Sequence, residues 1–140
     1  PKHELWAELG YDFQYDLRRD DARGTVDADG NPIFGPDGVQ VLLAKNGYRN
    51  AARLFLGYVN QINDKVAFNA GVEYLQGFIK TADFSVSEQI RVNLETGLTV
   101  QLIKSLAINT TFAMRFDNGP LPDVRKLDTA TALSLVYRFF

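Results

Sequence analysis

Hydrophobic and polar residues alternate along most of this chain with a period of two residues. Between residues 5 and 17 every odd position is apolar, whereas the even positions from Glu8 onward carry polar residues or glycine. A period of two places successive side chains on opposite faces of a β-strand. The same pattern predicts five further strands, at 52–62, 66–78, 90–102, 106–117 and 127–139.

The lengths of these strands and of their connections favour a membrane protein. The strands span roughly 11 to 13 residues, whereas about 5 to 6 is typical of globular proteins and about 9 to 11 suffice for a tilted membrane strand. The links at 63–65 and 103–105 are short, and those at 18–47, 79–89 and 118–126 are long. Bacterial outer-membrane barrels have short periplasmic turns and long external loops. We therefore expect the first strand to run outward and Pro1 to lie in the periplasm.

The predicted fold class is all-β: an antiparallel up-and-down transmembrane β-barrel. Residues 1–140 form one barrel domain or its C-terminal part, with a long extracellular loop at about 18–47. About eight strands make the smallest membrane barrel, so six strands indicate part of a larger one. The missing strands could precede this sequence, come from the first loop, or be supplied by other chains sharing one barrel.

A soluble sandwich or lipocalin-like barrel would show the same alternation with its apolar face inward. Three features favour lipid instead. The apolar positions within the strands carry no charged residue, the cations on the polar positions are arginines rather than lysines, and aromatic side chains gather near strand ends as interfacial girdles do. The arginines are Arg53, Arg91, Arg115 and Arg138, and the aromatic residues include Tyr11, Phe13, Tyr15, Tyr74, Tyr137 and Phe139.

Composition narrows the function classes. The formal net charge of −2 provides no bulk attraction for nucleic acid. The absence of cysteine excludes disulfides, thiolate metal sites and a cysteine nucleophile. No run of about 18 apolar residues is present, so no transmembrane helix is expected. We expect no cofactor.

Several runs of residues resemble a known family. They are Asn93-Leu94-Glu95-Thr96, Arg115-Phe116-Asp117-Asn118, Asp128-Thr129, Leu135-Val136-Tyr137-Arg138-Phe139, Arg53-Leu54-Phe55-Leu56-Gly57-Tyr58 and Glu73-Tyr74-Leu75. In these runs the chain resembles the salt-induced outer-membrane protein family, which is catalogued as a domain of unknown function. The resemblance covers most of the chain after residue 48 and leaves out the first loop. It implies a barrel in the outer membrane of a Gram-negative bacterium and brings no known activity.

The end of the chain resembles the signal that outer-membrane proteins present to their assembly machinery. In that signal, alternate hydrophobic positions close on an aromatic residue, and here Phe140 adds one residue beyond the usual terminal phenylalanine. The residues that match the signal are Leu133, Leu135, Tyr137 and Phe139.

Residues for catalysis or metal binding are scarce. The only histidine, His3, lies at a terminus, so a Ser-His-Asp site is not expected. Glu73 and Glu95 resemble an acid/base pair, but each has an arginine neighbour that favours a structural ion pair. Residues 27–31 hint at a calcium loop, yet the ligand spacing fails and turn formation explains their composition better. We therefore expect no enzyme.

The two short turns fix a register and hence a set of interior charge pairs. If Ile62 lies opposite Val66 and Leu102 opposite Leu106, then Arg53 and Glu73 become diagonal neighbours on the polar face. The same counting makes Glu95 and Arg115 diagonal neighbours. The full set of expected interior charges is Arg53, Glu73, Arg91, Glu95, Arg115, Asp128 and Arg138.

The function expected from the sequence is a small outer-membrane barrel with a structural or passive, porin-like role. An alternative is a non-channel scaffold that docks a lipoprotein, a cytochrome or another envelope subunit through the first loop or an open sheet edge. A barrel enzyme acting on lipid is a weaker third class. The expected partners are outer-membrane lipid, the assembly machinery, and a further copy of the chain or an envelope protein.

Overall fold

The protein folds into six long β-strands. The computed structural model describes residues 2–17, 19, 24–27, 29–81, 84–120 and 125–139. Within them, no helix is both long and apolar enough to cross a membrane. The elements are β1 (Lys2–Leu17), β2 (Asn46–Asn63), β3 (Val66–Gly77), the short 3-10 helix η2 (Val86–Glu88), β4 (Ile90–Ile103), β5 (Leu106–Asp117) and β6 (Leu127–Tyr137).

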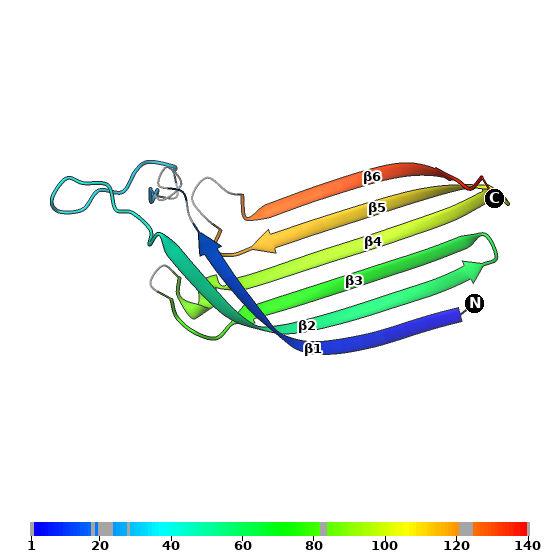
Figure 1. The fold of residues 1–140 in the computed structure, drawn as a ribbon, viewed down its shortest axis with the longest axis horizontal. Coiled ribbons are helices and arrows are strands. Elements are labelled where there is room, and N and C mark those ends of the chain that lie inside the picture. Colours follow the sequence, from blue (N-terminus) through cyan, green and yellow to red (C-terminus); the bar gives the residue numbers. More distant parts are fainter. Residues whose placement is uncertain are drawn as a thin grey trace.

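The strands form one antiparallel sheet in which each strand pairs with its neighbours in the chain, in the order β1 to β6. Both termini lie at the same end of the sheet as the two short turns, and we call this the turn end (Figure 1). The long connections lie at the opposite end, the loop end. The sheet is open, because no pairing between β1 and β6 is present among the described residues. The predicted alternation of short and long connections is confirmed.

Two details of the strand predictions require correction. The second strand begins at Asn46 rather than Ala52, because residues 46–51 pair with the end of β1. Next to each short turn the register shifts at a β-bulge, so that Asn63 rather than Ile62 lies opposite Val66. The same shift places Ile103 opposite Leu106. Away from the turns the predicted register is confirmed, with Phe55 opposite Glu73 and Glu95 opposite Ala113.

The two faces of the sheet differ in composition, most clearly in where the charged residues lie. On one face the register joins apolar positions into continuous rows, such as Phe68, Leu98, Thr110 and Leu133. We call this the apolar face, and its strand positions carry no Asp, Glu, Lys or Arg in the described part of the chain. The other face, the polar face, holds rows such as Thr99, Asn109 and Ser134.

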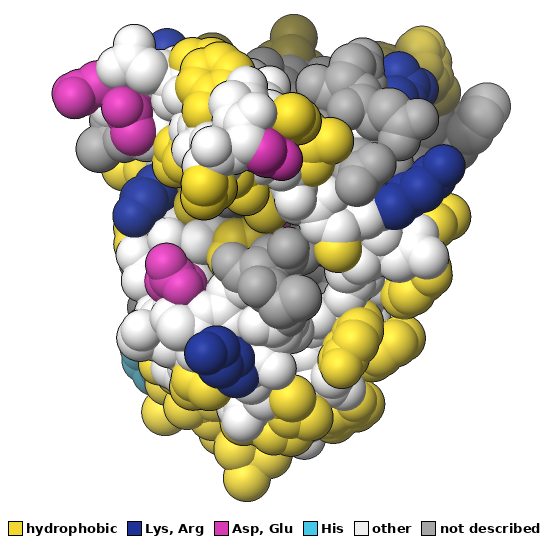
Figure 2. All heavy atoms as spheres, turned by 90° about the vertical axis from the view of Figure 1, so that its left-hand side faces the viewer, with side chains coloured by type: hydrophobic (Ala, Val, Ile, Leu, Met, Phe, Trp, Pro, Cys, Tyr) yellow, Lys and Arg dark blue, Asp and Glu magenta, His cyan; other side chains and the backbone are white. Residues whose placement is uncertain are grey.

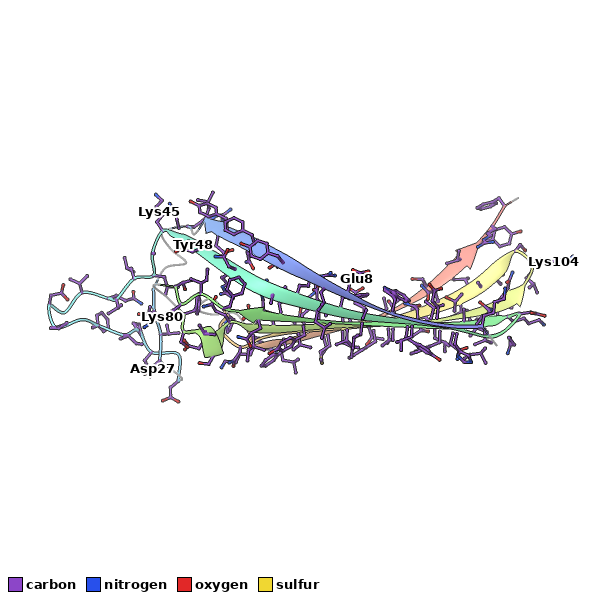
Figure 3. All side chains as sticks on the ribbon, turned by 90° about the horizontal axis from the view of Figure 1, so that it is seen from below. Glu8, Asp27, Lys45, Tyr48, Lys80 and Lys104 are labelled. Carbon is purple, nitrogen blue, oxygen red and sulfur yellow. The ribbon has the colours of Figure 1, made fainter. Side chains whose placement is uncertain are left out.

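The sheet is strongly twisted, and its two outer strands curl toward the same side (Figure 3). Glu8 stands on that side, so the polar face is the concave one (Figure 3). Ala51, on the polar face, is 2% exposed, whereas Leu9, on the apolar face, is 86% exposed. The apolar side chains therefore point outward.

The described residues contain no conventional hydrophobic core. Only Ala51 and Leu75 are buried hydrophobic residues, whereas a long series of Leu, Tyr, Phe and Val side chains on the apolar face is exposed. The accessible surface is 9942 Å², compared with about 7,300 Å² for a typical monomeric protein of this mass. Seen from the loop end, hydrophobic side chains gather along the lower rim of the molecule (Figure 2). Such a surface requires a partner or an apolar solvent.

The first long connection extends beyond the loop end of the sheet as a small antiparallel unit (Figure 1). It is held by isolated pairings between Gly24 and Leu42, Val26 and Pro32, and Phe34 and Gln40. Its two tight turns contain Gly30 and Gly38, whose φ angles of 86° and 74° favour glycine. The turn chemistry read from the sequence is confirmed.

Candidate functional site: the charged concave face

The most distinctive feature of the polar face is an arginine that reaches across the sheet. The Arg91 guanidinium on β4 donates from Nη2 to Asp12 Oδ2 at 2.6 Å and from Nη1 to Gln14 Oε1 at 2.7 Å. Both acceptors belong to β1, and two strands separate β1 from β4 in the sheet. Neighbouring strands lie about 4.8 Å apart, so this contact requires a strongly concave sheet.

A second arginine spans the same number of strands. Arg49 Nη1 on β2 lies 3.2 Å from Asp117 Oδ2 on β5, and Arg49 Nη2 donates to the Gly119 carbonyl oxygen at 2.8 Å. The guanidinium carbon also lies 4.2 Å from the centroid of the Phe84 ring, a distance at which cation–π attraction is significant. The Arg49 side chain is only 6% exposed. An acid, a carbonyl group and a ring compensate for much of the burial of this cation, while its Nε atom is buried without a hydrogen-bond partner in the described chain.

A third arginine joins neighbouring strands. Arg53 donates from Nε to Glu73 Oε1 on β3 and, at 3.3 Å, from Nη1 to Glu8 Oε2 on β1. The other oxygen of Glu73 accepts a hydrogen bond of 2.7 Å from Asn93 Nδ2 on β4. The expected pair between Arg53 and Glu73 is thus present, as part of a chain of polar contacts across four strands.

The most buried residues of the described chain lie at this loop end. Leu75 is 3% exposed and lies between Arg53 and Arg91 in the register. Gln89 is 2% exposed, and its Nε2 group donates to the carbonyl oxygens of Ile79, Phe84 and Ser85. Polar side chains therefore form the packed interior of this end together with Ala51 and Leu75.

Beside the arginine contacts lies a groove of about 830 Å³. Glu95, Arg115 and Asp128 line it. The register makes Glu95 and Arg115 diagonal neighbours as expected, yet no ion pair joins them among the described residues, and both are exposed. The expected pair is therefore wrong as a contact, and both side chains face the groove instead.

Near the middle of the sheet, side chains rest on glycines of the neighbouring strand. A Cβ atom on Gly57 would lie 2.2 Å from the Trp6 ring, and one on Gly71 would lie 3.0 Å from the Phe55 ring. A Cβ atom on Gly97 would lie 2.5 Å from Oδ1 of Asn69. These contacts form a diagonal row across β1 to β4, in which the absence of a side chain lets the neighbour lie flat on the sheet.

The remaining predicted positions have mixed outcomes. Asp128 lies directly opposite Arg115, but no ion pair joins them in the described chain. The backbone N–H of Arg138 donates a hydrogen bond to the Ser105 carbonyl oxygen at 2.8 Å. Sequence reasoning missed Arg49, which it placed beside the first loop. Continuing the alternation backwards from Ala52 through Asn50 and Tyr48 would have placed Arg49 on the polar face.

The structure also places the residues of the suggested assembly signal, whose role stays a prediction, and those of the rejected calcium loop. Leu133 and Leu135 lie on the apolar face of β6, and the Tyr137 and Phe139 rings lie 4.9 Å apart, while Phe140 is outside the described residues. The backbone N–H groups of Asn31 and Asp29 donate to Asp27 Oδ1, at 2.9 Å each. Hydrogen bonding by Asn31 holds the pKa of Asp27 below its usual value.

A search of the curated proteins and a search of the solved structures found no match to this chain. One family model matches nearly the whole length, over residues 1–139. The chain therefore belongs to the family described as "protein of unknown function, DUF481".

Proposed function

We propose that this protein is an integral β-barrel protein of a bacterial outer membrane, in which the six strands form part of the barrel wall. The observation that carries the proposal is the apolar face, which crosses all six strands without a charged residue in the described chain and is exposed. In water, a hydrophobic surface of this extent is strongly unfavourable. In a bilayer, the same surface contacts hydrocarbon.

The distribution of side chains supports this location. Tyr11, Phe13 and Tyr15 lie on the apolar face near the loop end, and Tyr137 and Phe139 lie near the turn end. Aromatic girdles of this kind mark the two interfaces of membrane barrels. The resemblance to the salt-induced outer-membrane protein family points to the same membrane.

The role that the concave face supports best is a structural or narrowly pore-like one, without catalysis. The side chains of Arg49 and Arg91 cross the interior near the loop end. We therefore expect a small conductance in planar bilayers, which increases when Arg49 and Arg91 are both replaced by alanine. A large conductance that the double replacement leaves unchanged would contradict a constriction at these residues.

The scaffold alternative is supported by one observation on the first loop. Phe34 and Val39, at the end of the small antiparallel unit, are 60% and 61% exposed. Apolar side chains on a protruding loop suit the docking of an envelope protein. Loss of a co-purifying envelope protein after Phe34→Ser and Val39→Ser, with unchanged conductance, would favour this role over the pore.

Adjacent residues on opposite faces of β4 test the membrane location. We expect Leu98→Arg to destabilise folding into lipid vesicles by about 2 to 4 kcal/mol, the cost of a lipid-facing arginine near the bilayer centre. Thr99→Arg, on the polar face, is the matched control and should cost less. Cysteines at the same two positions should react preferentially with lipid-soluble and aqueous reagents, respectively. Preference of the aqueous reagent for position 98 would exclude the proposal.

A further inference from the structure

Each arginine that crosses the concave face also has an acid on an adjacent strand, besides the more distant acid that it binds. Arg91 binds Asp12 on β1, yet Asp117 lies directly opposite Arg91 on the adjacent strand β5. Arg49 binds Asp117, although Asp12 is its diagonal neighbour on the adjacent strand β1. Each arginine therefore binds the acid that lies next to the other arginine.

An exchange of partners would keep every one of these charges paired. Residues directly opposite each other on adjacent strands have Cβ atoms about 4.5 to 5.5 Å apart, and diagonal neighbours lie about 7 to 8 Å apart, within reach of long side chains. After the exchange, Arg91 would bind Asp117 and Arg49 would bind Asp12. Because a buried charge without its partner is very unfavourable, a concerted exchange of this kind is the least costly way to move either arginine.

We propose that these four residues exchange partners, and that the exchange closes and opens the interior at the loop end. In the crossed arrangement, which the structure shows, both guanidinium groups span the concave face. In the wall arrangement, each guanidinium lies beside an adjacent strand and leaves the interior clear. This inference rests on the narrow pore proposed above and assigns its regulation. All four residues belong to this sheet, so the exchange does not depend on any strands beyond it.

The contacts of Arg49 explain why the crossed arrangement predominates. Its guanidinium donates to the Gly119 carbonyl oxygen and lies over the Phe84 ring, and both contacts are lost when it turns toward β1. In the opposite sense, Arg49 Nε is buried without a hydrogen-bond partner in the described chain, which weakens the crossed arrangement. The ion pairs favour neither arrangement, since each contains two. A minor state separated by contacts of this kind is typically populated at about 0.1 to 10%.

The crossed arrangement shields the part of the sheet that lies beneath it. A side chain that reaches from β4 to β1 passes over β3 and β2. The residue beside Arg91 on β3 is Leu75, which is 3% exposed. In the wall arrangement Arg91 turns the other way, toward β5, and uncovers this position. The accessibility of position 75 to an aqueous reagent therefore measures how often the exchange takes place.

Two charge reversals that share one substitution fix the two arrangements separately. Arg49→Asp with Asp117→Arg keeps opposite charges in both crossed pairs and sets like charges against each other in both wall pairs. Arg91→Asp with Asp117→Arg does the reverse. We expect each double variant to recover stability that Asp117→Arg alone removes, as measured by unfolding titrations in lipid vesicles.

Labelling of Leu75→Cys with an aqueous thiol reagent, in the full-length protein in native membranes, measures the exchange itself. The chain contains no cysteine, so this thiol is the only one in this sequence. Relative to Leu75→Cys alone, we expect labelling at least about tenfold faster with the Arg91 and Asp117 reversal, and at least about threefold slower with the Arg49 and Asp117 reversal, because each removes one of the two populations. Thr99→Cys is the reference position and should react at the same rate in all three backgrounds.

Phe84→Leu tests the exchange without any change of charge. It weakens a contact of Arg49 alone, yet it should raise the labelling rate at position 75, which Arg91 covers, by about threefold, because the two arginines move together. Phe78→Leu is the matched control, since it makes the same change in the same connection at a ring without an arginine contact in the described chain. We expect Phe78→Leu to leave the labelling rate unchanged.

The outcomes separate the exchange from the pore. Recovery of Asp117→Arg by Arg49→Asp but not by Arg91→Asp would overturn the exchange, and so would labelling of position 75 that is equal in every variant, even if the protein conducts. Labelling of position 99 that rises as much as that of position 75 would also overturn it, because the whole sheet would then be loosened. Labelling in the expected order, without current in planar bilayers, would support the exchange and exclude only the pore.

Discussion

The loop end and the turn end of the concave face are built in different ways. At the loop end, Arg49 and Arg91 each cross the sheet to an acid three strands along the order of pairing. Trp6 and Phe55 lie on glycines of the adjacent strand near the middle of the sheet, and from there to the turn end the polar positions of β2 to β6 carry small or neutral residues. Contacts between distant strands stabilise the loop end, whereas the other contacts join adjacent strands.

This difference follows from the need to satisfy polar groups in a narrow space. Where two strands face each other across the concave sheet, the planar guanidinium of an arginine can pair with an acid on the far strand and exclude water. Toward the turn end the polar positions carry neutral side chains, which need no ion pair, and Trp6 and Phe55 pack against glycines of the neighbouring strand. Changes at the loop end should consequently affect stability more than matched changes at the turn end.

Replacement of Arg49 by methionine should have the largest effect. It would leave the Asp117 carboxylate partly buried without its cation, and breaking a buried ion pair typically costs about 3 to 5 kcal/mol. Unfolding titrations in lipid vesicles measure this cost. Arg138→Met, at the turn end, should change stability by less than about 1 kcal/mol because its side chain is exposed. Equal effects would remove the distinction between the two ends.

Gly57→Ala should produce the next largest effect. Its new methyl group would overlap the Trp6 ring, and overpacking of this kind typically costs about 1 to 3 kcal/mol. Gly10→Ala is the control, because its Cβ atom would lie 3.7 Å from the nearest atoms of Arg53. We expect Gly10→Ala to be neutral or slightly stabilising. Similar losses of stability in both variants would show that packing of Trp6 on Gly57 contributes little to stability.

A double-mutant cycle on Asp12→Asn and Arg91→Gln should give a coupling energy of about 1 kcal/mol, since the pair is partly buried. The same cycle on Glu95→Gln and Arg115→Gln should give a coupling energy near zero, because these side chains are exposed and form no ion pair in the described structure. A larger coupling energy for the second pair would mean that these two side chains meet in the folded protein.

The smallest expected effect concerns pH and the loop that contains η2. Ser85 donates to Glu88 from its hydroxyl at 2.6 Å and from its backbone N–H at 2.8 Å, and these bonds hold the pKa of Glu88 below its usual 4.5. A lowered pKa stabilises the folded loop above pH 4.5, and this stabilisation is lost as pH falls through the folded value. Because Glu88 is exposed, the contribution should stay under about 1 kcal/mol.

Amide exchange of residues 84–89 between pH 6 and pH 3 measures this effect. Ser85→Ala should move the transition toward the ordinary pKa of a glutamate, because it removes the hydroxyl donor. A transition that Ser85→Ala leaves unchanged would contradict the role of this hydrogen bond.

The sequence by itself determined the strands, the two faces and most of the register. A period of two assigns each side chain to a face without knowledge of the fold, so adjacent residues such as Leu98 and Thr99 fall on opposite faces. Two short turns then fixed which residues lie opposite each other, including Phe55 and Glu73. These properties depend on local geometry and on neighbours in the chain.

Only the tertiary structure decided which charges meet. The partners of Arg91 and Arg49 lie three strands away, and their approach depends on the curl of the whole sheet rather than on any local pattern. The β-bulges beside the two short turns were also not predicted from the sequence. At each bulge one strand contains one extra residue next to the turn, and the register of the remaining pairs is the same as without it. Glu95 and Arg115 are diagonal neighbours by register, yet both side chains are exposed in the groove and form no ion pair in the described structure.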